Sequence, residues 1–316
     1  MNNMKLRVCL TEKCNFKCEY CRPGGEGTET KEKLLHNDET IQIINKLVEC
    51  GIEGVRFTGG EPLLRRGFAD IVEKVSKIEN VKKYTLVTNG SLINPRKAKQ
   101  ISELGFKSVA ISLDSMSNNN FVKITGVNML ARVKNAISEL KSCGVRVKIN
   151  TVVTKSNETE LDDIINFCIE NKCDLKLLDL YDGEIGFWRD NYINMKTIIK
   201  KLESSAEDFS IQYQDEGFGT PENVFKIGGI NIVVKDSNDG TCYVEGCKKC
   251  DLFPCQMGIV SLILTAEGRI KLCPLSNENN IDARGLINNR SSEVMNEVGK
   301  LFNYYNTAKF SKSWHS

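Results

Sequence analysis

Three cysteines near the N-terminus have the spacing of an iron–sulfur ligand set. The sequence Cys14-x3-Cys18-x2-Cys21 directly follows an apolar segment that is expected to form the first strand. Three thiolates on one loop can bind three irons of a [4Fe–4S] cluster, and the fourth iron then has no protein ligand. An open metal position is typical of catalytic sites, because a substrate or cofactor must coordinate there. A zinc knuckle is the alternative, but it needs a fourth ligand, and the nearby Cys9 lies inside the expected strand.

Four more cysteines form a second candidate metal site toward the C-terminus. Cys247-x2-Cys250-x4-Cys255 is followed by Cys273, and Cys242 is a spare candidate. A second [4Fe–4S] cluster is the favoured interpretation, and a four-cysteine zinc ribbon is the alternative that the spacing leaves open. Four ligands would saturate every iron, whereas three would leave one iron open to a substrate. Four other cysteines are expected to be small core residues, namely Cys50, Cys143, Cys168 and Cys173.

A repeating strand–helix pattern between residues 5 and 180 must position the first three cysteines. Near-continuous apolar strands that alternate with amphipathic helices indicate a parallel sheet, either open or curled into a partial barrel. The expected strands are Leu6–Leu10, Val55–Phe57, Tyr84–Val87, Val109–Leu113, Val145–Val153 and Leu175–Leu180. The expected helices are Glu39–Glu49, Phe68–Ile78, Pro95–Leu104, Met129–Cys143, Glu160–Glu170 and Met195–Phe209.

Cap residues mark several of these helix ends. Asp38 and Asn94 stand where N-caps belong, and Pro95 is suited to a first helical position. Three glycines are expected to end helices in the left-handed conformation, namely Gly51, Gly105 and Gly144.

The pattern changes after about residue 215, where glycines separate short strand-like segments and the second cysteine group appears. Ser261–Ala266 and Arg269–Leu272 predict a hairpin. We therefore expect an α/β protein with a partial (βα)6 TIM-type barrel over residues 1–215. A smaller cysteine-rich iron–sulfur subdomain with a tail would cover residues 216–316.

Composition excludes several classes of protein. The 43 Lys and Arg residues against 41 Asp and Glu residues give a net charge of +2, which argues against a nucleic-acid binder. The sequence has no apolar segment long enough to span a membrane and no signal peptide at its N-terminus. Thirteen cysteines in a chain expected to be cytoplasmic indicate metal binding or catalysis, not disulfides. With only two histidines, any metal must be held mostly by thiolates.

The N-terminal half resembles the radical S-adenosylmethionine (radical SAM) superfamily. The superfamily signature is the cysteine spacing described above with an aromatic residue, here Tyr20, before the last cysteine. Thr58-Gly59-Gly60-Glu61-Pro62 follows the second strand and resembles the family's Gly-Gly-Glu motif. Two glycines allow a backbone to approach a ligand closely, and here the ligand would be the amino group of S-adenosylmethionine.

The resemblance implies a cofactor site along the carboxyl ends of the strands. Thr88-Asn89-Gly90, Ser112-Leu113-Asp114 and Lys148-Ile149-Asn150 lie on that rim. Turn chemistry for Asn89-Gly90 and a helix cap for Asp114 are the alternative readings. The implied cofactor-binding residues are Tyr20, Arg56, Thr58, Gly59, Gly60, Glu61, Thr88, Asn89, Ser112, Asp114, Lys148 and Asn150, with Arg7 as a substrate contact.

Within the superfamily, the chain most resembles the GTP cyclases of molybdenum-cofactor biosynthesis. The stretches Thr11–Phe16, Val55–Arg65 and Leu264–Cys273 carry this resemblance. Counted back from Cys273, however, Gln256 and Ile259 replace two cysteines of that branch. Ser261 and Ile263 replace two arginines, and the C-terminal double glycine is absent. Since arginine is the preferred phosphate ligand, we expect the substrate not to be GTP.

The resemblance implies two [4Fe–4S] clusters, S-adenosylmethionine, and an electron donor such as flavodoxin or ferredoxin. A 5′-deoxyadenosyl radical would take a hydrogen atom from the substrate, which we expect to be a small polar metabolite such as a sugar, nucleoside or amino-acid derivative. No side chain is assigned a catalytic role. The alternatives are modification of a ribosomally made peptide, the GTP 3′,8-cyclase reaction, and a non-catalytic cysteine-rich zinc protein.

Overall fold

The computed structural model describes residues 5–21, 34–181, 186–214, 218–251, 253, 255, 257–275 and 280–311. Its strands are β1 Lys5–Cys9, β2 Gly54–Thr58, β3 Lys83–Thr88, β4 Ser108–Ser112, β5 Arg146–Val152, β6 Asp174–Leu178, β7 Asp208–Gln214, β8 Phe218–Ile227, β9 Ile230–Lys235, β10 Thr241–Tyr243, β11 Leu262–Leu264, β12 Arg269–Lys271, β13 Ile281–Asp282 and β14 Lys309–Ser311. Its α-helices are α1 Asn37–Glu49, α2 Phe68–Ser76, α3 Pro95–Glu103, α4 Asn118–Thr125, α5 Leu130–Ser142, α6 Leu161–Glu170, α7 Phe187–Asn191, α8 Met195–Glu203 and α9 Ser291–Asn306.

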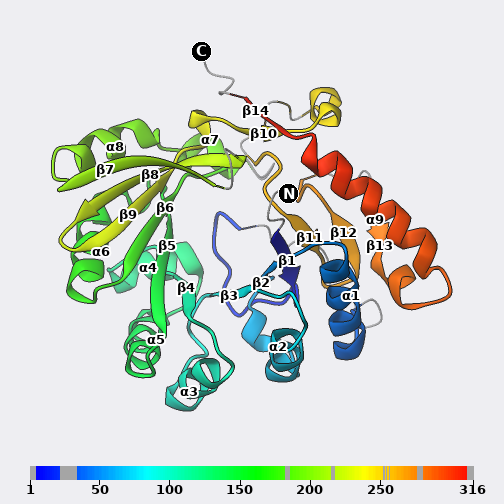
Figure 1. Ribbon diagram of the computed structural model, residues 1–316. Coiled ribbons are helices and arrows are strands. Elements are labelled where there is room, and N and C mark those ends of the chain that lie inside the picture. The colour runs from blue at the N-terminus through cyan, green and yellow to red at the C-terminus, as the bar shows by residue number, and fades with distance from the viewer. Residues whose placement is uncertain are drawn as a thin grey trace.

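Six parallel strands form the centre of one large sheet. Its order is β13-β12-β11-β1-β2-β3-β4-β5-β6-β9-β8-β7, and neighbours from β1 to β6 pair in parallel. Helices follow these strands and lie on the outer side of the curved sheet, as Figure 1 shows. The expected partial (βα)6 barrel is confirmed.

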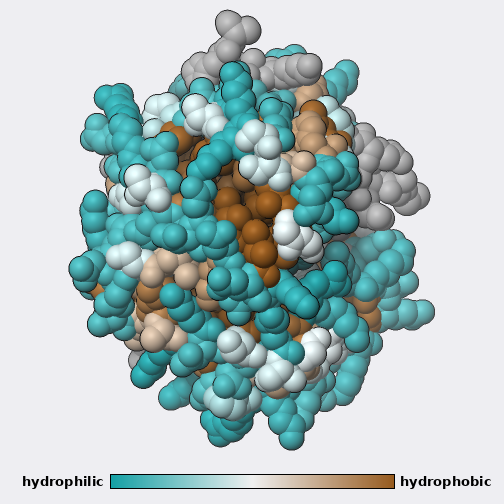
Figure 2. Space-filling view, turned by 90° about the vertical axis from the view of Figure 1, so that its left-hand side faces the viewer, coloured by the Kyte–Doolittle hydropathy of each residue, from teal (hydrophilic) through white to brown (hydrophobic). Residues whose placement is uncertain are grey.

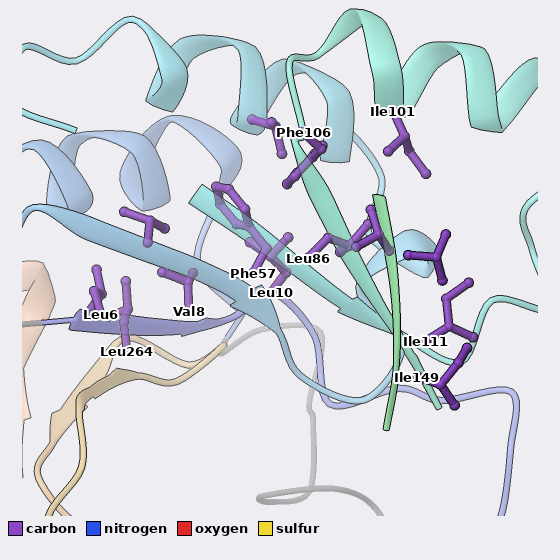
Figure 3. Close-up of a cluster of buried hydrophobic side chains, with 14 of the residues drawn as sticks. Leu6, Val8, Leu10, Phe57, Leu86, Ile101, Phe106, Ile111, Ile149 and Leu264 are labelled. Carbon is purple, nitrogen blue, oxygen red and sulfur yellow. The ribbon is translucent and has the colours of Figure 1, made fainter. Parts of the chain in front are cut away.

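The outer face of the sheet packs against the helices through alternate residues of each strand. Leu6 and Val8 of β1 pair in register with Val55 and Phe57 of β2, and all four side chains are buried. Figure 3 shows such residues lying between sheet and helices. Because side chains alternate along a strand, the residues between them point to the concave face. There the strands carry Arg7, Arg56, Ser112, Lys148 and Lys176. The expectation of near-continuous apolar strands is therefore wrong on this face.

Helix ends agree with the sequence at most predicted positions. The side chain of Asn94 accepts a bond from Lys97 N at 2.9 Å, and Pro95 opens α3. At α1, however, the N-cap is His36 and not Asp38, because Glu39 Oε2 accepts a 2.7 Å bond from His36 N. Asp38 lies in the first turn, where its charge still favours the helix dipole. The predicted C-terminal glycines have positive φ angles, namely Gly51, Gly105 and Gly144.

Most strands after residue 215 extend the same sheet at both ends, while β10 and β14 pair with each other in a separate two-stranded sheet. β8 and β9 form a hairpin that joins β6, while β11 pairs in parallel with β1. The predicted hairpin is present as β11 and β12. Helix α9 follows β13 and lies beside α1 (Figure 1), where Cys50 Sγ and Met295 Sδ are 3.6 Å apart. The division at residue 215 stays a prediction, and Gln256 and residues 312–316 lie outside the described residues.

The far edge strand β7 carries exposed apolar side chains. Phe209, Ile211 and Tyr213 are 40 %, 53 % and 53 % exposed. Figure 2 shows this side of the molecule, on which hydrophobic residues gather in the centre of a mostly hydrophilic face. Among the described helices, none is long and apolar enough to cross a membrane.

Candidate active site and metal centres

The first cysteine loop is held by the Gly-Gly segment that follows β2. Gly60 N donates to Thr11 O at 2.7 Å, and Glu61 N donates to Lys13 O at 2.8 Å. A Cβ on Gly59 would meet Thr11 O at 2.3 Å, and one on Gly60 would meet Lys13 O at the same distance. Both positions therefore exclude any side chain, because the backbone of the cysteine loop already fills that space.

A closed set of side-chain hydrogen bonds links the same loop to the end of β3. Asn89 Nδ2 donates to Asn15 Oδ1 at 2.9 Å, and Asn15 Nδ2 donates to Ser91 Oγ at 2.8 Å. Ser91 Oγ donates in turn to Asn89 Oδ1 at 2.7 Å. Asn89 Nδ2 also lies 3.8 Å from Cys14 Sγ. This arrangement fixes Cys14 beside β3.

Tyr20 ties the other end of the loop to β4 and β5. Its hydroxyl donates to Asp114 Oδ2 at 2.7 Å, while Asp114 Oδ1 accepts from Val152 N at 2.9 Å. Burial raises the pKa of Asp114 to about 6, although the Tyr20 and Val152 bonds oppose this rise. Both oxygens of Asp114 are thus engaged within the protein.

Glu61 of the Gly-Gly-Glu segment is fully buried and makes three hydrogen bonds. Its carboxylate accepts from Thr88 Oγ1 at 2.7 Å, Asn89 N at 2.8 Å and Leu63 N at 3.1 Å. Burial raises the pKa of Glu61, while these three bonds lower it. The side chain joins the segment after β2 to the end of β3.

The three N-terminal thiols lie close enough to interact with one another. Burial is the largest cause of the raised pKa of Cys18, and the nearby charges of Asp114, Cys21 and Cys14 raise it further. Burial likewise raises the pKa of Cys14. Isolated thiolates are thus disfavoured here, and coordination to iron stabilises thiolates in such a place. The donor set fits three irons of a [4Fe–4S] cluster.

The C-terminal cysteines surround one cavity. Cys247, Cys250, Cys255 and Cys273 all line a cavity of about 100 Å³ that is open to solvent. The charges of the other three also raise the pKa of Cys247, after burial, so the four thiols lie near one another. Apolar side chains complete the lining, namely Val244, Phe253, Ile259, Leu272, Leu275 and Leu301. Cys242 is buried in β10 outside this lining.

Four thiols around one cavity fit a second cluster. Within the described residues, no three His, Cys, Asp or Glu side chains converge on a point that would hold a single metal ion. The ligands of a four-iron cluster need not converge on a single point, because each cysteine binds a different iron. The two cysteine groups therefore fit clusters in their donor chemistry.

The concave face holds a charged group that the sequence analysis only partly found. Arg56 of β2 is opposite Arg7 of β1 in register and lies near Glu222 of β8. Lys235 of β9 is opposite Glu222 in register, and Lys176 of β6 forms an ion pair with Glu222. β2 and β8 are far apart in the sheet order. Their charges meet because the sheet curls, so this group lies inside the partial barrel.

Cations exceed carboxylates in this lumen group, which we define as Arg7, Arg56, Lys176, Lys235, Asp179 and Glu222. Desolvation lowers the pKa of Lys235, and nearby Lys176 and Arg56 lower it further, against Asp179 and Glu222. Desolvation and Arg7 lower the pKa of Arg56 in the same way. The sequence could have indicated this group. Lys176 lies within apolar β6 and Lys235 ends apolar β9, and both stand at alternate positions that face the lumen.

Three predicted cofactor contacts are not engaged by the protein. Ser112 and Asn150 are opposite one another on β4 and β5, with Lys148 two residues before Asn150. Their side chains make no hydrogen bond or ion pair with the residues that the structure describes. These polar groups are thus available to a ligand, in contrast to Glu61 and Asp114.

Comparison with known proteins places this site in a family. The profile of the Radical SAM superfamily matches residues 8–168, which contain all three cysteines of the first loop. The chain belongs to the radical SAM superfamily. This radical SAM enzyme uses S-adenosylmethionine and two [4Fe–4S] clusters, and the zinc-protein alternative is discarded.

Relatives of this radical SAM enzyme agree over nearly its whole length. It is 31 % identical over 287 residues to the GTP 3′,8-cyclase of Peptoclostridium acidaminophilum, covering 89 % of this chain and 82 % of that one. It is 31 % identical over 304 residues to the GTP 3′,8-cyclase of Clostridium acetobutylicum, covering 94 % and 89 %. The suspected branch of the superfamily is therefore confirmed.

A solved structure supports the fold. "Native anSMEcpe with bound AdoMet" aligns with a TM-score of 0.62 at 18 % identity, covering 92 % of this chain and 82 % of that one.

The expectation that the substrate is a small metabolite other than GTP is wrong, because these relatives are GTP 3′,8-cyclases. It rested on Ser261 and Ile263, which stand in place of two arginines. Ile263 of β11 lies opposite Arg7 in register. The sequence analysis counted the two arginines that Ser261 and Ile263 replace, but it did not count Lys176 and Lys235, which lie across the lumen.

Proposed function

We propose that this enzyme is a GTP 3′,8-cyclase, which joins the 3′ carbon of the ribose of GTP to carbon 8 of its base. The observation that carries the proposal is the excess of cations in the lumen group. Among the residues that the structure describes, four cations of this group lie near two carboxylates, and a nucleoside triphosphate supplies the negative charge that this excess attracts. The names and the coverage of the relatives support the same substrate.

We assign the two cysteine groups to two different clusters. Cys14, Cys18 and Cys21 would bind the first cluster and leave one iron open for S-adenosylmethionine. Bound there and reduced by one electron, S-adenosylmethionine supplies the 5′-deoxyadenosyl radical that removes a hydrogen atom from the substrate. The second cluster would have a cysteine on every iron, with Cys247, Cys250, Cys255 and Cys273 as its ligands. That ligand set leaves substrate binding to the lumen group.

The chain's own residues would hold the cofactor at the rim of the barrel. The backbone at Gly59 and Gly60 and the unengaged side chains of Ser112, Lys148 and Asn150 are the first candidates. Glu61 and Asp114 would act by fixing the loops around the cofactor, since their oxygens are taken. The remaining assignments stay predictions, namely Tyr20, Arg56, Thr58, Thr88 and Asn89 for the cofactor and Arg7 for the substrate.

The reaction consumes two electrons for each nucleotide. One electron cleaves S-adenosylmethionine to methionine and, after hydrogen transfer, 5′-deoxyadenosine. The nucleotide loses a hydrogen atom from C3′, forms the C3′–C8 bond, and takes up the second electron and a proton. Its product is therefore an isomer of GTP. A flavodoxin or ferredoxin is the proposed electron donor, and we place the enzyme in the cytoplasm with neither nucleic acid nor membrane as a partner.

Deuterium transfer tests the proposal. Anaerobically reconstituted enzyme is incubated with GTP deuterated at C3′, S-adenosylmethionine and dithionite, and the quenched mixture is separated by chromatography with mass detection. We expect 5′-deoxyadenosine that carries one deuterium and a nucleotide isomer with a new retention time. Cys18→Ala is the matched control and should give neither. Unlabelled 5′-deoxyadenosine with unchanged GTP would overturn the proposal.

A further inference from the structure

Glu222 is the one carboxylate of the lumen group that faces cations from three different strands. It forms an ion pair with Lys176 of β6 and lies opposite Lys235 of β9 in register. Its charge also acts on Arg56 of β2 from across the lumen. The side chain is only 17 % exposed, so water screens these interactions weakly.

The second carboxylate of the group is already committed elsewhere. Asp179 Oδ2 accepts bonds from Ser237 N at 2.9 Å and from the Ser237 hydroxyl. Asp179 also lies near Lys235. Asp179 acts on Lys235 more strongly than Glu222 does, whereas Glu222 is the carboxylate that pairs with Lys176 and lies near Arg56. Glu222 is therefore the anion that faces the middle of the cation group, in the place where an anionic group of a substrate would bind.

Like charges in this group repel one another, so the effect of removing an anion on phosphate binding has a predictable sign. Arg56, Lys176 and Lys235 are held together at a cost that Glu222 offsets. A phosphate that enters this region must displace Glu222 from Lys176 or share the cation with it. In both cases the carboxylate of Glu222 opposes binding of the phosphate. It repels the phosphate directly, and it occupies the lysine N–H groups that the phosphate would need.

We infer that Glu222 is a specificity-determining residue, which competes with the phosphates of the substrate for Lys176 and Lys235. This inference rests on the proposed function, because it takes a nucleoside polyphosphate as the ligand of the lumen. Its competition sets how much negative charge the lumen accepts and prevents the nucleotide from binding too tightly to turn over.

Binding of inorganic triphosphate tests the inference without any radical chemistry. Iron–sulfur-loaded enzyme and its Glu222→Gln variant are titrated with triphosphate anaerobically by calorimetry at two salt concentrations. We expect the variant to bind triphosphate about tenfold more tightly, which is about 1.4 kcal/mol, with a larger loss of affinity at high salt. Guanosine, which has no phosphate, should bind both proteins equally.

Two further variants separate competition from a structural role. Glu222→Asp keeps the charge and should bind triphosphate within about twofold of the parent. Glu203→Gln removes the same charge from the exposed end of α8 and should change nothing. Equal or weaker triphosphate binding by a Glu222→Gln variant with an unchanged melting temperature would overturn the inference.

The outcome also separates this inference from the proposed reaction. Tighter triphosphate binding without deuterium transfer from GTP would support the competition by Glu222 and refute the cyclase assignment. Deuterium transfer from GTP with unchanged triphosphate binding would support the cyclase assignment and refute the competition by Glu222.

Discussion

The two cysteine regions of this enzyme are held in different ways. The loop with Cys14, Cys18 and Cys21 makes hydrogen bonds with the segment after β2, with the ends of β3 and β4, and with α4, where Lys17 N donates to Thr125 O at 2.8 Å. The described part of the second region has mostly local turns, such as Cys250 N to Cys247 O at 3.0 Å. Its bonds to more distant residues include those from Tyr243 to Cys255 O, from Gly246 N to Tyr304 and from Tyr305 to Val260 O, beside the pairing of β10 with β14.

This difference indicates how each metal site is formed. The hydrogen bonds of the first cysteine loop come from the protein itself, so we expect this site to be preorganised. Among the described residues, the second region makes fewer hydrogen bonds to the rest of the fold, and we expect its order to depend more on the cluster itself. Metal binding is then part of its folding free energy.

The largest expected effect comes from the preorganised site. Cys18→Ala should lower reductive cleavage of S-adenosylmethionine to the level without enzyme, because one iron ligand of the open cluster is lost. Cys250→Ala should keep measurable cleavage, because it affects only the second site. Chromatographic measurement of 5′-deoxyadenosine and iron analysis of both variants provide the test. Undiminished cleavage by Cys18→Ala would contradict the assignment of the first site.

Removal of iron should affect the two regions unequally. Trypsin cleaves after lysine, and exposed lysines lie in both regions, at Lys13 and Lys17 and at Lys248 and Lys249. After chelation of both clusters, we expect the rate of cleavage at Lys248 and Lys249 to rise at least about tenfold, which reflects a loss of about 1.4 kcal/mol in local stability. Cleavage at Lys13 and Lys17 should change much less. Mass spectrometry of timed digests measures both, and equal acceleration would refute the comparison.

Asp114 gives the first region a distinct pH dependence. Its pKa is raised by burial to about 6 from an ordinary value of 3.8. A carboxyl group with a raised pKa contributes stability below pH 4, and this contribution is lost as pH rises through 6. The unfolding free energy of the metal-free enzyme, relative to Asp114→Asn, should therefore fall by about 2.4 kcal/mol between pH 4 and 7. Urea unfolding at four pH values measures this difference, and parallel profiles would exclude it.

Two tyrosines provide the smallest and most closely matched test. Tyr20→Phe removes a bond to a buried carboxylate and should lower the unfolding free energy by about 1.5–3 kcal/mol. Tyr243→Phe removes a bond to the carbonyl of Cys255 and should cost about 0.5–1.5 kcal/mol. Thermal unfolding of the metal-free variants gives both values. A larger loss for Tyr243→Phe would reverse the comparison between the regions.

Much of the barrel and the identity of the first site could be predicted from the sequence. Apolar segments such as Val109–Leu113 and caps such as Asn94 are local signals, and the first cysteine triplet is a strong motif. The sequence did not indicate His36 as the cap because histidine is uncommon there, and the bond that the His36 N–H donates to the Glu39 carboxylate compensates. These successes depend on short-range chemistry.

The lumen group could not be assembled from the sequence in the same way. Arg56 and Glu222 are distant along the chain and on strands that are not neighbours, and only the curl of the sheet brings them together. The roles of Glu61 and Asp114 as internal acceptors also depend on contacts between strand ends. For both residues the motifs predicted a contact with the cofactor. The structure shows instead that their carboxylate oxygens already accept hydrogen bonds from the protein.

The parallel pairing of β1 with β11 has a consequence for synthesis of the chain. At about 5–20 residues per second, β11 leaves the ribosome roughly 10–50 s after β1. During that interval one edge of β1 has no partner, and the cysteine loop that follows it is already made. A chain that stops before Leu262 would keep this edge open, with its unpaired backbone groups available to other chains. Nascent chains of this enzyme therefore expose one edge of β1 to other chains until β11 has been made.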